Sequence, residues 1–104
     1  MKVEQLFDKD ISNEHALELK SLGFNEPCIN SFEYAPGEFC NIPTYLQSFI
    51  WFQNQYGLHQ TVEYDGNRNI FFATANTEYK GEFQNWDEAM LQCLIELINI
   101  VKTY

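Results

Sequence analysis

Histidine and cysteine are the residue types of this chain that can hold a transition metal or act as nucleophiles. The soft ligands are His15, Cys28, Cys40 and His59, which are separated by 13, 12 and 19 residues. Zinc sites are usually anchored by a close pair such as Cys-x-x-Cys or His-x-x-x-His, and the sequence has no such pair. We therefore expect no metal site.

A cysteine nucleophile needs a base and cationic surroundings that lower the pKa of the thiol. No lysine or arginine lies between Ser21 and Asn67, so Cys28 and Cys40 lack a cationic neighbour along the chain. Cys93 falls in an apolar helical pattern, where cysteine usually acts as a small hydrophobic side chain. We expect no catalytic residue, and a small enzyme using His15 or His59 stands as one alternative function.

Carboxylates are abundant because the chain is acidic, with a formal net charge of −9. Glu33, Glu38, Glu63 and Asp65 lie on or beside predicted hairpins, where a solvated surface is sufficient to explain them. Phosphates and anionic membranes are bound by lysine and arginine, so we expect neither direct nucleic-acid binding nor membrane binding. The charge is compatible with a basic protein partner. Carboxylates arrayed on one face would instead predict an acidic mimic of nucleic acid that inhibits a DNA-binding enzyme.

The glycines mark helix ends and turns and belong to no phosphate-binding run, so we expect no nucleotide or other cofactor. They are Gly23, Gly37, Gly57, Gly66 and Gly81.

Length and composition predict one domain with an aromatic core. The 104 residues include nine Phe, six Tyr and two Trp. Residues 1–8 lack the apolar region of a signal peptide, and the longest apolar runs, such as Phe49–Phe52, are far too short to span a membrane. We expect a cytoplasmic α+β domain over residues 11–104, preceded by a flexible arm over residues 1–10.

Three helices are predicted by their end signals, over residues 12–22, 44–56 and 85–102. Each begins at a residue type that caps helices, and the second and third begin with capping-box patterns. The first two end before Gly23 and Gly57, because glycine readily adopts the left-handed conformation that closes a helix. The apolar arc of the third helix is wide, which indicates a central helix or an oligomer interface.

Two hairpins are predicted between the helices. One joins residues 29–34 to 39–42 through a Pro-Gly turn, and the other joins residues 58–64 to 69–77 through Asp65-Gly66. The fold is therefore expected to be α+β, in the order α-β-β-α-β-β-α. The two antiparallel hairpins pack with three helices, either as separate hairpins or as one four-stranded sheet.

The second helix has no charged residue from Tyr45 to Tyr56, although exposed helix faces normally carry lysine and glutamate. An aromatic stripe with flanking Leu46 and Ile50 is expected to face the core, and Trp51 to point the other way. Interfaces are depleted in charge and enriched in Trp. The candidate interaction surface is therefore Gln47, Ser48, Trp51, Asn54 and Gln55. The alternative is that the chain itself covers this face.

One segment resembles a known group of proteins. It is Lys20-Ser21-Leu22-Gly23-Phe24-Asn25-Glu26-Pro27-Cys28, followed by Pro43-Thr44-Tyr45 and Trp51. It is similar to small proteins, with no assigned activity, of gut Bacteroides-type bacteria and their prophages. The similarity covers most of residues 11–102 and implies a phage or mobile-element context. It implies no cofactor and no site residue.

The absence of a reactive constellation and the uncharged second helix favour a non-enzymatic accessory domain. We expect it to act by binding a protein partner or by forming a homo-oligomer. The nucleic-acid mimic and the small enzyme are the alternatives.

Overall fold

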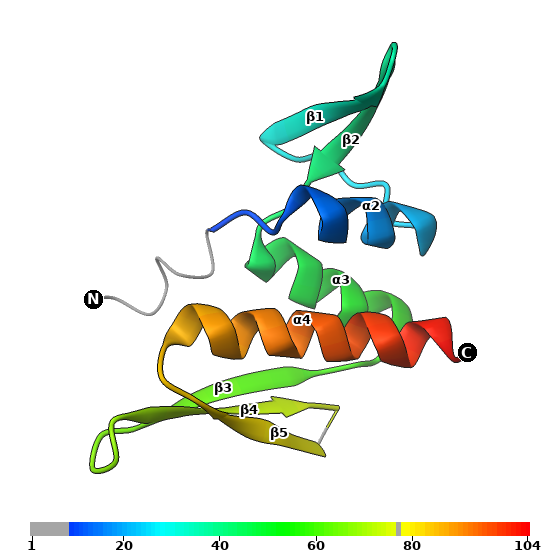
Figure 1. Ribbon diagram of the computed structural model, residues 1–104. Coiled ribbons are helices and arrows are strands. Elements are labelled where there is room, and N and C mark those ends of the chain that lie inside the picture. Colours follow the sequence, from blue (N-terminus) through cyan, green and yellow to red (C-terminus); the bar gives the residue numbers. More distant parts are fainter. Residues whose placement is uncertain (1–8, 77) are drawn as a thin grey trace. The chain divides into compact units, whose positions relative to one another are not determined.

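The computed structural model describes residues 9–76 and 78–104 and confirms the α+β class (Figure 1). The described part contains three helices and five strands, and every strand pair is antiparallel. The elements in chain order are α2 (Asn13–Ser21), β1 (Asn30–Ala35), β2 (Glu38–Ile42), α3 (Tyr45–Tyr56), β3 (Gln60–Asp65), β4 (Ile70–Ala75), β5 (Glu78–Phe83) and α4 (Trp86–Lys102).

The chain divides into two compact units, one ending at Ser48 and one running from Phe49 to Tyr104, with the boundary inside α3. Residues 1–8 of the predicted arm lie outside the described residues. Its last two residues are held in the first unit, because the Lys9 carbonyl accepts from the Tyr45 N–H and Asp10 forms a bridge with Thr44.

Both ends of helix α2 have the capping interactions that the sequence predicts. The Ser12 hydroxyl accepts the His15 backbone N–H at 3.2 Å, which satisfies one of the unpaired donors of the first turn. At the other end Gly23 has φ +110°, and the Phe24 N–H donates to the Leu19 carbonyl at 3.0 Å. Leu19 and Phe24 are both buried, as expected for this type of helix end.

Capping also fixes the starts of α3 and α4. The Gln47 N–H donates to the Thr44 hydroxyl and the Thr44 N–H donates to the Gln47 side chain, both at 3.1 Å, so the predicted capping box is present. The Asn85 side chain accepts from the Glu88 N–H at 2.9 Å. Asp87 and Glu88 also lie in the first turn of α4, where the helix dipole favours negative charge.

The β1–β2 hairpin is a two-stranded sheet in the first unit. It turns through Pro36 and Gly37, and the φ of +77° at Gly37 is the value that a type II turn requires at its third residue. Phe32 pairs with Cys40 and Glu33 with Phe39. The side chain of Cys40 is buried, so one face of the hairpin points inward.

The second unit contains the sheet β3-β4-β5, in which β5 was not predicted. Gly81 and charged residues make residues 78–83 a poor match to a strand pattern, because glycine and charge are depleted in strands. Gly81 has φ +129°, and the register between β4 and β5 shifts at Ala73 and Thr74. The two predicted hairpins thus belong to separate sheets, and the second gains an edge strand.

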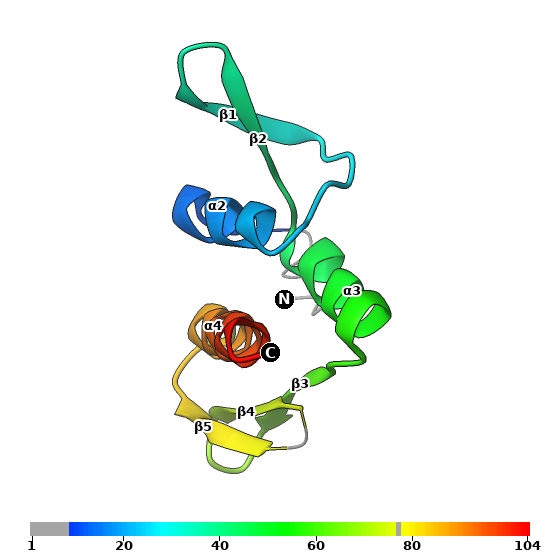
Figure 2. The same cartoon turned by 90° about the vertical axis from the view of Figure 1, so that its right-hand side faces the viewer.

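Helix α4 lies along one face of the β3-β4-β5 sheet (Figures 1 and 2). The Phe71 and Trp86 rings meet edge to face at 5.5 Å between centroids. Cys93 Sγ lies 3.8 Å from the Thr61 carbonyl oxygen and 3.7 Å from that of Thr74. The buried side chains of α4 are Trp86, Ala89, Met90, Cys93, Leu94, Leu97, Ile98 and Val101. No helix in the described part of the chain is long and apolar enough to cross a membrane.

Candidate functional site

The two histidines lie in different units. His15 belongs to the amino-terminal turn of α2, where its Nδ1 lies 2.8 Å from the Ser12 hydroxyl and its Nε2 lies 4.0 Å from a Glu18 carboxylate oxygen. His59 is exposed, and its backbone carbonyl accepts from the Asn76 N–H at 2.7 Å. Among residues 9–76 and 78–104, no three His, Cys, Asp or Glu side chains are grouped as metal ligands.

The pKa values of all three cysteine thiols are raised, whereas the thiol of a cysteine nucleophile has a lowered pKa. Burial raises the pKa of half-buried Cys28, and the nearby Asp10 and Glu26 carboxylates raise it further. Burial also raises the pKa of Cys40, although Lys20 partly opposes that shift. Burial raises the pKa of Cys93 to about 11. Because the thiolate is the reactive form, all three are poor nucleophiles at neutral pH.

Protonated Cys93 has a consequence for stability at high pH. Its native pKa exceeds the ordinary thiol value of about 8.5, so the native state holds this proton more tightly than the unfolded chain does. This contribution is fully present below about pH 8.5 and is lost as the pH rises toward 11. We expect the free energy of unfolding, measured with urea at pH 8 and pH 10.5, to fall more steeply in the wild type than in Cys93→Ala. Equal slopes would contradict the burial of this thiol.

The predicted interaction surface on α3 is only partly exposed. Trp51 is 4% exposed and Ser48 0%, so these two side chains are covered by the chain itself and do not belong to an exposed interaction surface. The Trp51 ring meets the rings of Phe52 and Tyr56 at centroid distances of 5.1 and 5.5 Å. Gln47 is half-buried, and its amide donates to the Pro27 carbonyl.

The remaining members, Asn54 and Gln55, are exposed, as expected. The hydroxyl of buried Ser48 donates to the Thr44 carbonyl at 2.9 Å, so its burial leaves that polar group satisfied. A large indole covers more apolar surface than Leu or Ile, so turning Trp51 inward is favoured over burying Leu46 and Ile50.

The side of α3 that does face solvent carries two aliphatic side chains. Leu46 is 42% exposed and Ile50 46%, and Gln53 and Asn54 are also exposed. At about 100° per residue these four positions share one face of the helix, so their spacing is set by α3 itself. We call Leu46, Ile50, Gln53 and Asn54 the outer face of α3. It contains no charged residue.

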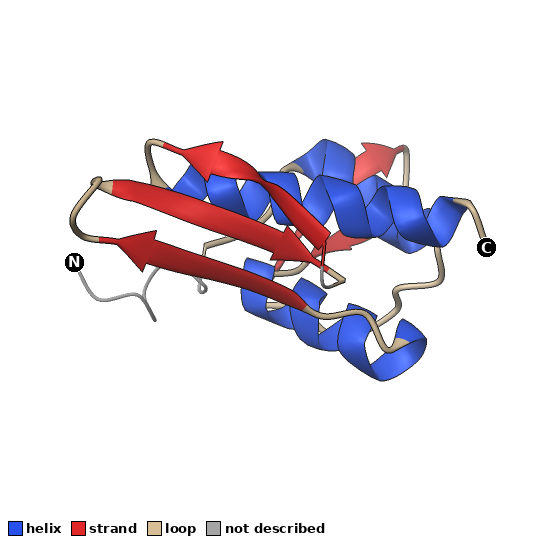
Figure 3. Cartoon of the chain, turned by 90° about the horizontal axis from the view of Figure 1, so that it is seen from below, coloured by secondary structure: helices blue, strands red, loops and turns tan. Residues whose placement is uncertain are grey.

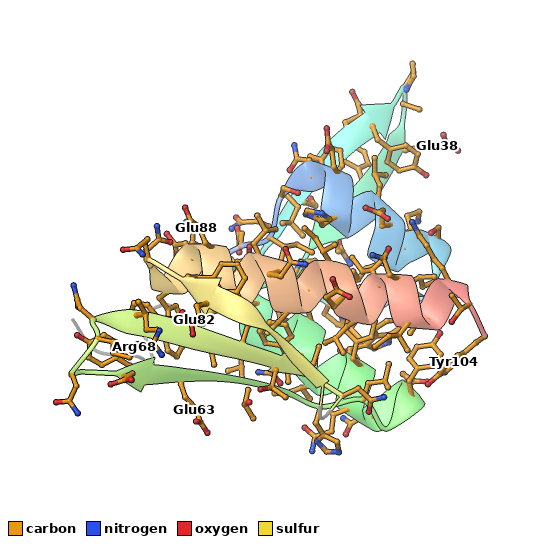
Figure 4. The ribbon with its side chains drawn as sticks, turned by 60° about the horizontal axis from the view of Figure 1, so that its bottom comes forward. Glu38, Glu63, Arg68, Glu82, Glu88 and Tyr104 are labelled. Carbon is orange, nitrogen blue, oxygen red and sulfur yellow. The ribbon has the colours of Figure 1, made fainter. Side chains whose placement is uncertain are left out.

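The carboxylates singled out in the sequence lie on several elements. Glu33, Glu38 and Glu63 are exposed, whereas Asp65 accepts from the Asn67 and Arg68 N–H groups in the β3–β4 turn. Figure 4 shows Glu63 and Glu82 projecting from the sheet, with Arg68 beside Glu82 at 3.0 Å.

Within the second unit the acids point to opposite sides. Glu63 and Glu82 pair with the same β4 residue, so they occupy the sheet face that lies away from α4. Figure 3 shows this sheet face toward the viewer with α4 behind it. Glu88 is exposed on α4 itself. Among the described residues of this unit, the carboxylates therefore form no single array.

A shallow hollow lies in the first unit, beside the β1–β2 hairpin. Its lining combines one cation, two amides, two aromatic rings and a buried thiol, contributed by Lys20, Phe24, Asn25, Phe39, Cys40 and Asn41. The sequence analysis did not find this hollow, because its residues come from three separate segments.

Comparison of the chain with protein-family models, curated proteins and solved structures gave no match. The relationship to small Bacteroides-type and prophage proteins therefore stays a prediction.

Proposed function

We propose that this chain is a non-enzymatic domain that self-associates through the outer face of α3. The observation that carries the proposal is the exposure of two aliphatic side chains, Leu46 and Ile50, on a helix without ionic groups. Exposed helix faces in water normally carry charge, and interface centres are depleted in it.

The occupant that we favour for this face is a second copy of the chain. Each chain has a formal charge of −9, so two copies repel one another over most approaches. This repulsion is smallest when the two copies meet through an uncharged surface, because no carboxylates then face one another at the centre of the interface. The outer face of α3 is such a surface, and Leu46 and Ile50 supply apolar area that association removes from water.

The expected complex is weak. A helix of 12 residues is about 18 Å long, so two such faces bury less than the roughly 1,200–2,000 Å² of a stable interface. We therefore expect a dimer that depends on protein concentration. The low-affinity contact suits an accessory domain that assembles where its local concentration is high.

Light scattering after size exclusion tests the proposal. We expect the mass of the wild type to rise above 12.3 kDa as the protein concentration is raised toward the millimolar range. Ile50→Glu places a carboxylate on the outer face of α3 and is expected to hold the chain at the monomer mass at every concentration.

The matched control is Tyr64→Glu. Tyr64 is a large side chain that is 53% exposed, and its replacement adds the same charge at a position outside α3. We expect this variant to associate more strongly than Ile50→Glu. Equal loss of association in the two variants would show a general effect of charge, and a wild type that stays monomeric would refute the proposal.

A further inference from the structure

The β1–β2 hairpin presents a second surface, on the face opposite buried Cys40. Strand residues alternate between faces, and the register pairs Ser31 with Asn41 and Glu33 with Phe39. All four of these side chains are exposed. We call Ser31, Glu33, Phe39 and Asn41 the outer face of the hairpin.

An aromatic ring and a carboxylate are neighbours on this outer face. Phe39 is 59% exposed, and it lies directly across the ladder from Glu33. The Cβ atoms of such a pair are about 4.5–5.5 Å apart. The Gly37 N–H donates to a Glu33 carboxylate oxygen at 3.2 Å, which holds the acid beside the turn. Ring and carboxylate are therefore presented together to solvent.

A ring beside a carboxylate is suited to a cation, because the ring face carries a negative quadrupole and the acid a full negative charge. The same hairpin already contains an example on its other side. The Lys20 ammonium lies over the Tyr34 ring, 5.8 Å from its centroid. No lysine or arginine lies between residues 21 and 67, so the hairpin itself supplies no cation for Phe39. Lys20 lines the hollow beside the hairpin together with Phe39, and its ammonium already lies over Tyr34.

We propose that the outer face of the hairpin binds an arginine side chain on a basic segment of a partner protein. The planar guanidinium stacks on Phe39 while its N–H groups donate to Glu33. Glu38, exposed at the start of β2 on the other face, adds to the negative charge of the hairpin. A basic segment complements the −9 charge of the chain, which also accelerates its approach. This inference is independent of self-association through α3.

Nuclear magnetic resonance titration with an octa-arginine peptide tests the proposal. We expect amide shift changes concentrated in residues 30–42. Phe39→Leu keeps apolar bulk but removes the ring, and we expect it to bind the peptide about two- to fivefold more weakly, the loss expected for an exposed cation–π contact. Octa-lysine should bind more weakly than octa-arginine, because an ammonium neither stacks nor binds a carboxylate in a bidentate manner.

Two matched pairs of variants distinguish binding at this site from general charge attraction. They are Glu33→Gln with Glu63→Gln, and Phe39→Leu with Tyr64→Leu. Glu33→Gln and Glu63→Gln have the same net charge, and we expect only the first to weaken binding beyond the loss of one charge. Tyr64→Leu removes a similarly exposed ring from β3 and should leave the affinity unchanged. Equal losses in Glu33→Gln and Glu63→Gln, shift changes spread over the whole chain, or no binding at all would overturn the proposal. Ile50→Gln, on the outer face of α3, should bind the peptide as the wild type does.

Discussion

Replacing Trp51 by alanine is expected to lower the free energy of unfolding by about 3–5 kcal/mol. Its indole is 4% exposed and lies edge to face against Phe52 and Tyr56, so truncation removes apolar burial and leaves a cavity. Domains of this size have a total stability of about 5–15 kcal/mol, so the variant is expected to be close to unfolding. Urea denaturation followed by circular dichroism measures the difference.

Asn54→Ala is the control on the same helix. Asn54 is exposed on the outer face of α3, and its replacement should change the stability by less than about 0.5 kcal/mol. A similarly small effect for Trp51→Ala would place that indole in solvent. It would restore the surface predicted from the sequence and remove the reason to assign Leu46 and Ile50 to the outer face.

Truncation of Leu97 in α4 is the second large effect that we expect. Leu97 is 0% exposed within the longest helix of the described chain, and Leu97→Ala should cost about 2–5 kcal/mol. Asn99→Ala, at an exposed position two residues away, is the matched control and should be nearly neutral. Thermal and urea unfolding of the two variants measure the contrast, and comparable losses would contradict the burial of this side of α4.

Local signals allowed the helices of this chain to be predicted well. Ser12, Thr44 and Asn85 cap the three helices as expected, because capping depends on side chains within three residues of the helix start. Gly37 and the turn after Asp65 were likewise identified by local chemistry. The pairing register was left open for the second hairpin, and the structure pairs Asp65 with Ile70.

The burial of α3 could not be predicted in the same way. Periodicity points Trp51 away from the aromatic stripe, but Trp51 and Ile50 lie on opposite sides of that stripe. The rotation of the helix about its own axis therefore decides which of the two is buried. That rotation depends on tertiary packing, which has no local signature. Strand β5 was missed for a related reason, since its ladder with β4 compensates for a weak intrinsic strand preference.

The sequence predicted an uncharged surface on α3 but did not identify which of its side chains are exposed. The absence of charge from Tyr45 to Tyr56 was visible in the sequence, but the exposed side chains turned out to be Leu46 and Ile50 instead of Trp51. The Glu33–Phe39 pair could not be found from spacing alone, because it depends on the register of the β1–β2 ladder. Residues six apart in sequence become neighbours only when that register is known.

Sedimentation velocity of the unmodified chain at low and high ionic strength tests self-association most directly. Salt screens the repulsion between two chains of charge −9 and leaves apolar contacts intact, so the sedimenting mass should rise from about 0.05 M to 0.5 M sodium chloride. A single species of 12.3 kDa at every concentration and ionic strength would contradict the account. A dimer that dissociates in salt would contradict it equally, because that contact would be ionic.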